Sequence, residues 1–461
     1  MYTYQDLIKV GENEQERASF CKAAVEQFMA SEDYKLAKAG EAYYAKHNIT
    51  IEKFEKFLYT ISGARIKDIW SANFKLKTQH FRRLIIQQVQ YVLGNGLTLS
   101  DTKNKEKLGA NFDYQLQKAA KHALASGRAF GFWNLDHLEV FGYCDTAQEP
   151  GFCPLYDEDT AELSAGIRYW FKHVGDITIF RATLYEADGY TEYAIKNSED
   201  PEVVEPKRSY KQTVISTNMG IEETTSENYG KLPIIVMYGN DLHKSELDGM
   251  RENIDCYDFI KSGLANNIDD ADGFYWLVQN SGGMDDTDLA AFIERMKTVH
   301  AAAVEGEGAT PHTIEIPTEA RKVMLDILNQ DIYDDFQMTD IKNLSAAQKT
   351  TQEIDAAYQS QDNKCADFEY LMLEFVQSIL TLAGINDTPS FVWNKVVNQT
   401  EYTAMVLSAS NYLTDEMVIK KLPFLTPEEQ AEVIAQRNLE SQNMFNQPKA
   451  EEDDELEEDE E

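Results

Sequence analysis

The N-terminal part of the chain carries apolar and aromatic side chains at helical spacing. Residues 1 to about 60 follow this pattern, and so do residues 77–93, where apolar positions recur every three or four residues. Gly94 and Gly96 come directly after, and glycine supplies the left-handed backbone geometry at which helices commonly end. A further helical segment, at about 112–126, ends at Gly127. The pattern predicts a mainly helical N-terminal region.

Between residues 128 and about 236 the pattern changes to short runs of aromatic and β-branched residues. Clusters of Gly, Asp, Asn and Pro separate these runs at the intervals expected of hairpins. We therefore predict a mostly antiparallel sheet, with strands near 129–133, 138–143, 166–174, 177–185, 190–195, 212–217 and 232–238.

Helical spacing returns at residue 244, and the helices predicted beyond it are long. An amphipathic pattern over 244–270 would give a helix of roughly 40 Å at 1.5 Å per residue. A second helix is predicted at 319–338 and a third at 346–383, with Gly384 as its C-cap. Short elements complete the expected order: strands near 274–278, 301–304 and 312–316, a helix after Asp285, a strand at 390–397 and helices within 400–446.

Charge limits the function classes that are open to this chain. Its 461 residues include 79 acidic and 43 basic side chains, a formal net charge of −36. A protein that grips nucleic acid neutralises phosphates with Lys and Arg, so this balance disfavours tight, sequence-specific DNA binding. The acidic run at 447–461 is of low complexity, and we expect it to be disordered.

Signatures of catalysis, metal binding and membrane insertion are absent from the sequence. It contains no GxxxxGK[ST] loop, no HExxH and no GxSxG, and its five cysteines form no CxxC pair. The stretch 269–273 is similar to a calcium loop, but Ile268 occupies the first ligand position. We interpret His80, His122, His243 and His300 as surface or satisfied core residues. No run of 18 apolar residues exists and no secretory signal begins the chain, so we expect a cytoplasmic protein without cofactor or metal.

The order of the predicted elements resembles that of portal proteins from long-tailed phages of Gram-positive bacteria. The resemblance covers about residues 70–440, and no single piece of it is specific. The segments that carry it are 81–97, ending YVLGNG, PLYD at 154–157, GIRY at 166–169, LPIIV at 232–236, the helix 245–269 with SGLANN at 262–267, SFVWN at 390–394, LTDE at 413–416 and TPEEQ at 426–430.

This resemblance implies an elongated α+β portal fold with named parts. Residues 1–243 would be the wing, 244–269 and 318–339 the paired stem helices, and 270–317 a small α/β insert called the clip. The remaining parts would be a tunnel loop at 340–350, a long helix and return strand at 351–399, a helical crown at 400–446 and the disordered acidic tail at 447–461.

The resemblance also implies a function and a set of partners. The chain would be a structural subunit, not an enzyme, in a homo-oligomeric ring of twelve copies at one capsid vertex of a virion. The ring would pass double-stranded DNA non-specifically during packaging and ejection. Its partners would be the large terminase, the major capsid and scaffold proteins and the head–tail adaptor, with assembly in the host cytoplasm and no contact with a membrane.

Three groups of candidate functional residues follow from the resemblance. The tunnel loop would present Lys342, Asn343, Ser345, Gln348 and Lys349 to DNA, and two of these are basic. Acidic side chains of the second stem helix would face the channel: Asp326, Asp331, Asp334 and Asp335. The clip would contact its partners through Asp285, Asp286, Glu305, Glu307 and His312.

Other interpretations of the same residues remain open. The acids of the long helices would equally suit a helix face that is simply solvated. Arg82 and Arg83, with the nearby lysines at 75, 77, 103, 105 and 107, form either a solvated basic patch or a contact with capsid or scaffold. The chain as a whole could instead be another virion-assembly or head-morphogenesis protein, or a cytoplasmic α+β enzyme.

Overall fold

The structure is a computed structural model that forms two compact units. One unit contains residues 1–340 and 358–394, and the other contains residues 341–357 and 395–461. The described residues are 1–59, 64–68, 71–196, 201–217, 220–271, 275–277, 310–312, 318–340, 351–394, 399–422, 430, 432–437 and 439.

The N-terminal region is helical, as predicted. It contains α1 (Tyr4–Val10), α2 (Glu14–Ala30), α3 (Glu32–Tyr44) and α4 (Ile49–Lys53). Side chains that accept hydrogen bonds from backbone N–H groups begin three of these helices: Asn13 caps α2, Ser31 caps α3 and Asn48 caps α4. A short antiparallel hairpin follows, formed by β1 (Phe57–Tyr59) and β2 (Arg65–Lys67).

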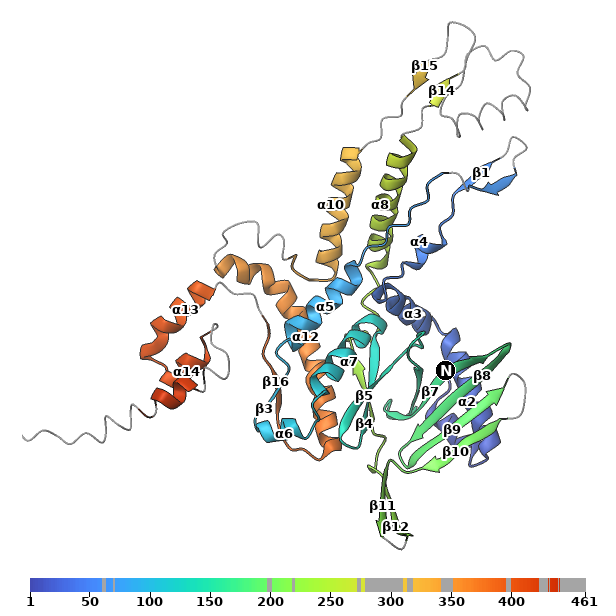
Figure 1. The fold of residues 1–461 in the computed structure, drawn as a ribbon, viewed down its shortest axis with the longest axis vertical. Coiled ribbons are helices and arrows are strands. Elements are labelled where there is room, and N and C mark those ends of the chain that lie inside the picture. Colours follow the sequence, from blue (N-terminus) through green and yellow to red (C-terminus); the bar gives the residue numbers. More distant parts are fainter. Residues whose placement is uncertain are drawn as a thin grey trace, which may run out of the picture. The chain divides into compact units, whose positions relative to one another are not determined.

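An eight-stranded sheet in the order β10-β9-β8-β7-β6-β5-β4-β13 is the centre of the first unit. Its pairs are antiparallel except β5 with β6, so the predicted antiparallel sheet is confirmed. Helix α2 contacts strands β6 to β10, and α7 contacts β4, β5 and β13 (Figure 1). The strands are β4 (Arg128–Asn134), β5 (His137–Gly142), β6 (Gly151–Tyr156), β7 (Leu163–Val174), β8 (Ile177–Glu186), β9 (Gly189–Lys196), β10 (Glu202–Arg208) and β13 (Ile234–Tyr238).

Aromatic side chains fill the space between α2 and the sheet. Phe28 of α2 makes edge-to-face contacts with Tyr34, Tyr143 and Tyr169, and Phe130 packs on Phe152 at a centroid distance of 4.4 Å. These rings are buried, and aromatic pairs of this geometry add to the stabilisation that burial provides.

In the sequence, two helices predicted from the spacing of their apolar residues come between the N-terminal helices and the strands of the sheet. They are α5 (His80–Leu93) and α7 (Phe112–Ser126), and the short elements β3 (Leu97–Leu99) and α6 (Thr102–Glu106) connect them. Gly127 ends α7 with φ +89°. A Cβ at this position would lie 2.6 Å from the His243 carbonyl oxygen, so both the backbone angle and the available space require glycine.

The long helices follow the sheet, with one correction to the predicted boundaries. Helix α8 covers Arg251–Ala271, so the prediction that it begins at 244 is wrong: residues 246–250 form turns, and Gly249 has φ +86°. Helix α10 covers Thr318–Asp335, and α12 covers Thr351–Ala383 before Gly384, which has φ +69°. Between α8 and α10, β14 (Tyr275–Leu277) pairs with β15 (Thr310–His312).

The remaining elements are short. β16 (Pro389–Phe391) pairs with β3, and β11 (Lys211–Thr217) forms a hairpin with β12 (Gly220–Glu227). The second unit contains α13 (Gln399–Ser408), the 3-10 turn η1 (Ala409–Asn411) and α14 (Asp415–Lys420). None of the helices in the described part of the chain has the length and apolar character needed to span a bilayer.

Candidate site at the paired long helices

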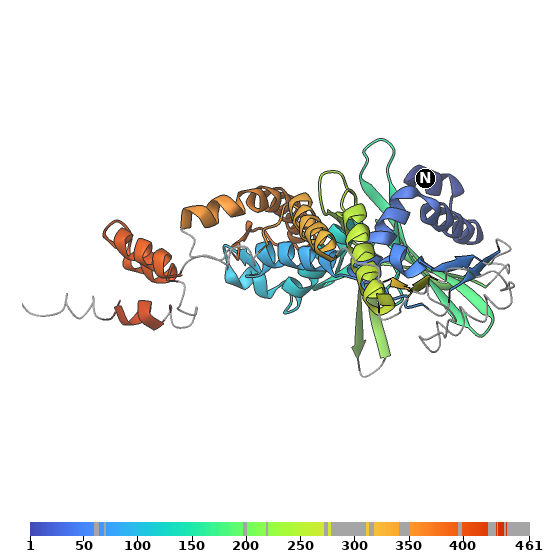
Figure 2. The ribbon, with the colours of Figure 1, turned by 90° about the horizontal axis from the view of Figure 1, so that it is seen from above.

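Helices α8 and α10 lie side by side and run antiparallel (Figure 1; Figure 2). At one end, the side-chain amide of Asn253 donates to the Asp335 carboxylate at 2.7 Å. At the other end, the Asn267 amide oxygen accepts from the two terminal nitrogens of Arg321, at 2.7 and 2.8 Å. These two contacts join the first turn of each helix to the last turn of its partner.

The exposed surface of α10 divides into an apolar half and an acidic half. Near its start, Val323 is 56% exposed and Ile327 is 48% exposed, with Met324 beside them. By helical spacing Asp331, Asp334 and Asp335 continue the same face, while Asp326 lies on a neighbouring one. All four predicted acids are exposed. The opposite face, with Leu328, Ile332 and Phe336, is buried.

A polar stripe on α8 binds the backbone of an extended segment that precedes α5. Asn266 Oδ1 accepts from the Phe74 N–H at 2.7 Å, and Ser262 Oγ accepts from the Leu76 N–H at 3.0 Å. Asp258 Oδ1 completes the series with the Thr78 N–H at 2.9 Å. Four helical residues rise about 6 Å and two extended residues about 6.6 Å, so successive partners stay in register.

Asp258 is the most constrained member of this stripe. Its side chain is fully buried, and besides the Thr78 backbone it accepts from the Thr78 hydroxyl at 2.7 Å and from Asn48 Nδ2 at 2.8 Å. Burial raises the pKa of Asp258 above its usual value, although the hydrogen bonds from Thr78 and Asn48 act in the opposite direction. One carboxylate therefore connects α4, the segment before α5 and the middle of α8.

The residues that flank the predicted tunnel loop are fixed by side chains of α5 and α12. The Thr339 N–H donates to Gln361 Oε1 at 3.1 Å, and the Thr339 carbonyl accepts from Gln87 Nε2 at 2.9 Å. Lys364 of α12 donates to the Phe336 carbonyl at 3.0 Å and forms a mostly buried ion pair with Glu246. The chain is thus firmly held just before residue 341.

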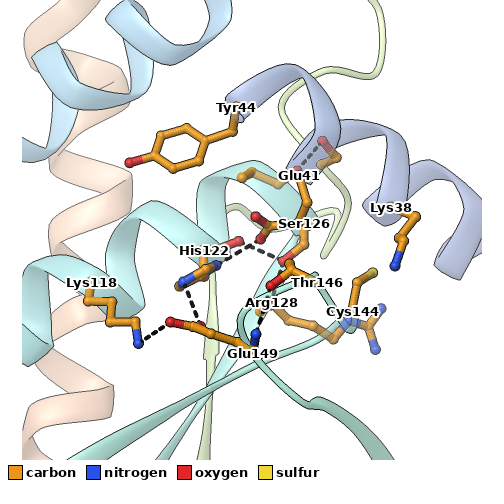
Figure 3. A network of polar contacts seen from close by, with 12 residues as sticks. Lys38, Glu41, Tyr44, Lys118, His122, Ser126, Arg128, Cys144, Thr146 and Glu149 are labelled. Atoms are coloured by element: carbon orange, nitrogen blue, oxygen red, sulfur yellow. Dashed lines mark hydrogen bonds and ion pairs between the residues drawn. The ribbon is translucent and has the colours of Figure 1, made fainter. Parts of the chain in front are cut away.

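A second polar network connects α3, α7 and the loop between β5 and β6 (Figure 3). His122 Nδ1 lies 2.9 Å from Glu41 Oε1, and His122 Nε2 lies 3.6 Å from Glu149 Oε2. Lys118 forms an ion pair with the other oxygen of Glu149 at 2.6 Å. Burial alone would lower the pKa of His122, but the carboxylate of Glu41 outweighs it and the pKa is raised.

Most residues predicted for DNA or partner contact lie outside the described residues. These are Lys342, Asn343, Ser345, Gln348 and Lys349 of the tunnel loop, and Asp285, Asp286, Glu305 and Glu307 of the clip. His312 is described only through its backbone, which pairs with Tyr275. Part of the stretch similar to a calcium loop also lies outside; among the described residues no cluster of three His, Cys, Asp or Glu side chains has metal-binding geometry.

The sequence reasoning missed the α8 polar stripe and the His122 network. The signal for the stripe was present, since Asp258, Ser262 and Asn266 recur every fourth residue. Three of the four histidines have the environments that were expected: His80 and His122 are largely buried, and His243 is exposed. His300 lies outside the described residues.

Comparisons with known proteins agree on one family. The model of a phage portal protein family, described as SPP1 Gp6-like, matches residues 31–444. A portal protein of Clostridium phage phiCD119 is 25% identical over 224 residues, 46% of this chain and 49% of that protein. A portal protein of Bacillus phage SPP1 is 23% identical over 311 residues, 65% of this chain and 60% of that protein.

The matches thus span between about half and three fifths of these relatives' own length. Among solved structures, a chain from the virion of a native gene transfer agent particle aligns with a TM-score of 0.40 and 11% identity. That alignment covers 74% of this chain and 89% of the other.

Proposed function

This chain belongs to the SPP1 Gp6-like family of phage portal proteins, and we propose that it forms the portal ring at one vertex of a phage capsid. Portal proteins are structural components of the virion, so the proposed role is architectural and not catalytic. In this role the ring is the conduit through which double-stranded DNA is packaged and later ejected.

The observation that carries this proposal is the exposed face of α10. Val323, Met324 and Ile327 lie in a row on a helix whose opposite side already packs in the unit. An apolar stripe of this kind needs a partner. A neighbouring copy provides it when each subunit contacts the next head to tail, and such contacts close into a ring when the rotation allows. The family resemblance implies twelve copies.

The acidic part of α10 lies beyond this apolar row, toward the end of the helix, and suits a DNA conduit. Asp331, Asp334 and Asp335 are exposed, and in a ring every copy repeats them. Duplex DNA carries one charge per ~1.7 Å of its axis, so a wall of carboxylates repels it and a wall of lysines would retain it. We propose that these acids, with Asp326, line the channel and let the duplex slide.

The segment 340–350 is proposed as the tunnel loop, since it joins α10 to α12 beyond the anchored residues Phe336 and Thr339. Its Lys342 and Lys349 would form a sparse basic collar, with Asn343, Ser345 and Gln348 beside them. The clip at 270–317 would receive the large terminase and then the head–tail adaptor, while capsid and scaffold proteins contact the wing. Assembly takes place in the host cytoplasm.

Native mass spectrometry of the purified full-length protein, together with negative-stain electron microscopy, tests this proposal. We expect one closed oligomer with a central hole, seen as a ring in end views. Compact small oligomers without a hole would contradict the portal function. They would favour the alternatives of a different assembly protein or a cytoplasmic α+β enzyme.

A further inference from the structure

An acidic pocket of about 770 Å³ lies where the segment before α8 meets α5, the end of α10 and the middle of α12. Five carboxylates line it, against only two ammonium groups. The acids are Asp241, Glu246, Asp248, Asp335 and Asp367, and the cations are Lys244 and Lys364. Glu246 is neutralised by Lys364, whereas Asp241 and Asp367 have no cation within ion-pair distance in the described part of the chain.

Gln88 provides independent evidence that something binds in this pocket. It lines the pocket and is only 1% exposed, yet neither its amide oxygen nor its amide nitrogen has a hydrogen-bond partner among the described residues. A buried amide without partners destabilises a fold, and native proteins rarely tolerate one. The isolated subunit therefore leaves a polar group prepared for a ligand that donates and accepts hydrogen bonds.

The rim of the pocket has the character of a protein contact. Leu242 is 72% exposed and Tyr370 is 73% exposed, and both belong to the pocket lining. Large apolar groups around a polar centre exclude water and strengthen the charge contacts inside, as in the centres of protein interfaces. A cationic side chain presented by a protein surface fits this combination better than a free ion does.

A complementary surface exists on the same chain. Lys121 of α7 lies near Arg82 of α5, whose guanidinium donates to the Tyr44 carbonyl at 3.2 Å and lies over the Tyr44 ring. Neither cation forms an ion pair with a carboxylate of the described residues. Burial, followed by the charge of Arg82, lowers the pKa of Lys121. The aromatic ring of Tyr114 is exposed on the same side of α7, seven residues before Lys121.

The acidic and basic surfaces cannot satisfy each other within one subunit. Arg82 and Gln88 are six residues apart on α5, which puts them on different faces of a helix with 3.6 residues per turn. In a head-to-tail ring, however, every copy offers one surface to the neighbour on each side.

We propose that the acidic pocket receives the Arg82 and Lys121 side chains of the adjacent copy, and that this contact sets the spacing of subunits in the ring. Asp241 and Asp367 neutralise the incoming cations, and Gln88 bonds to the inserted segment through its amide. This inference rests on the proposed portal function, because it needs a ring in which the same contact repeats.

A charge swap tests the contact directly in the full-length protein. Asp367→Lys and Lys121→Glu should each raise the protein concentration needed for half-assembly by about tenfold or more, since 1.4 kcal/mol corresponds to a factor of ten. The double variant should recover most of this loss. Glu106→Lys and Lys103→Glu make the same charge changes on exposed α6 positions and serve as controls.

The substitution Gln88→Leu tests whether Gln88 contacts the neighbouring copy or is simply a buried residue of the subunit. Because it removes an unsatisfied amide, the variant subunit should resist urea better than the wild type. The protein concentration that this variant needs for half-assembly of the ring should nevertheless rise at least threefold. A ring of unchanged stability would show that Gln88 has no role in the contact.

These experiments distinguish a failure of this inference from a failure of the proposed portal function. A wild-type protein that forms no ring contradicts both. Two results with wild-type rings present would overturn only this inference. Either the single charge variants assemble like their controls, or the double variant assembles no more readily than the weaker single variant. In both cases the pocket does not receive Arg82 and Lys121.

Discussion

The buried carboxylate of Asp258 accepts hydrogen bonds from both the backbone N–H and the hydroxyl of Thr78, at 2.9 and 2.7 Å. These contacts join the middle of α8 to the segment that leads into α5, although 180 residues separate them in sequence. Ser262 and Asn266 extend the same join along α8. A polar series therefore fixes the stem helix of the proposed portal to the N-terminal region, in addition to aromatic contacts such as that of Phe259 with Phe54.

Asp258→Ala should destabilise the subunit by about 3 kcal/mol or more, because it leaves the buried Asn48 amide and two partly buried Thr78 donors without their acceptor. Urea unfolding of the full-length variant measures this loss. Glu252→Ala changes an exposed acid on the same helix and should stay within about 0.5 kcal/mol of the wild type. Equal stability of the two variants would show that the polar series contributes little.

The His122 network predicts a pH dependence of stability. The pKa of folded His122 is raised above the ordinary value of 6.5, so its stabilising charge is fully present below that pH and is lost as the pH rises through the folded value. Between about pH 6 and 8, the free energy of unfolding should fall by up to about 1 kcal/mol per pH unit.

His122→Gln should remove this slope, because glutamine does not titrate. His173→Gln, at an exposed position of the β7–β8 hairpin, is the control and should keep the slope. Urea unfolding across the pH range distinguishes the two variants. A slope that persists in His122→Gln would assign it to another group.

The ion pair of Lys364 with Glu246 should contribute to stability mainly because both charges are largely buried. Lys364→Met leaves the Glu246 carboxylate largely buried without its cation and should cost about 3 kcal/mol or more. Adding Glu246→Gln should recover a large part of that cost, because no unpaired charge remains. A double-mutant cycle by urea unfolding gives the coupling, and a coupling near zero would contradict a direct interaction.

The exposed apolar face of α10 should act in assembly and not in folding. Val323→Glu combined with Ile327→Glu should leave the subunit folded but prevent ring closure, since two charges would enter an apolar contact. Native mass spectrometry reports the oligomer, and circular dichroism checks the fold. Val174→Glu, at an exposed apolar position on the β7–β8 hairpin, should still form rings. Intact rings from the α10 variant would remove the main support for this contact.

Lys342→Ala combined with Lys349→Ala should change genome packaging or genome retention while rings still form, because the basic collar of the proposed tunnel loop would be lost. A packaging assay with rings of the variant measures the effect. The variant Lys103→Ala, on the short helix α6, is the control. Unchanged packaging would mean that these two lysines do not meet the DNA.

Much of the fold was predictable because its signals are local. The helix at 112–126 and its end at Gly127 follow from periodicity and one glycine. Seven of the strands between residues 128 and 238 match runs of aromatic or β-branched residues. Strand β6 was missed because Pro154 interrupts its pattern, and β10 because it is charged and contains Pro206. The start of α8 was placed too early because Leu247 and Met250 continue the apolar spacing through a turn.

The candidate site was less predictable, since its contacts join distant residues. The charge of the second long helix made Asp331, Asp334 and Asp335 candidates, and their role stays a prediction. Polar positions such as Ser262 and Asn266, by contrast, normally indicate a solvated face. Here they are buried because an extended segment needs acceptors for its backbone N–H groups. No local pattern in the sequence identifies the extended segment that packs against these positions.

A cryo-electron microscopy reconstruction of the purified full-length protein tests the central claim most directly. The account predicts a closed ring in which the α8–α10 pairs of successive copies surround an open axis, with the row from Val323 to Ile327 against the neighbouring subunit. An assembly with no axial opening, or one whose α8 and α10 helices lie on its outer surface away from the axis, would contradict it.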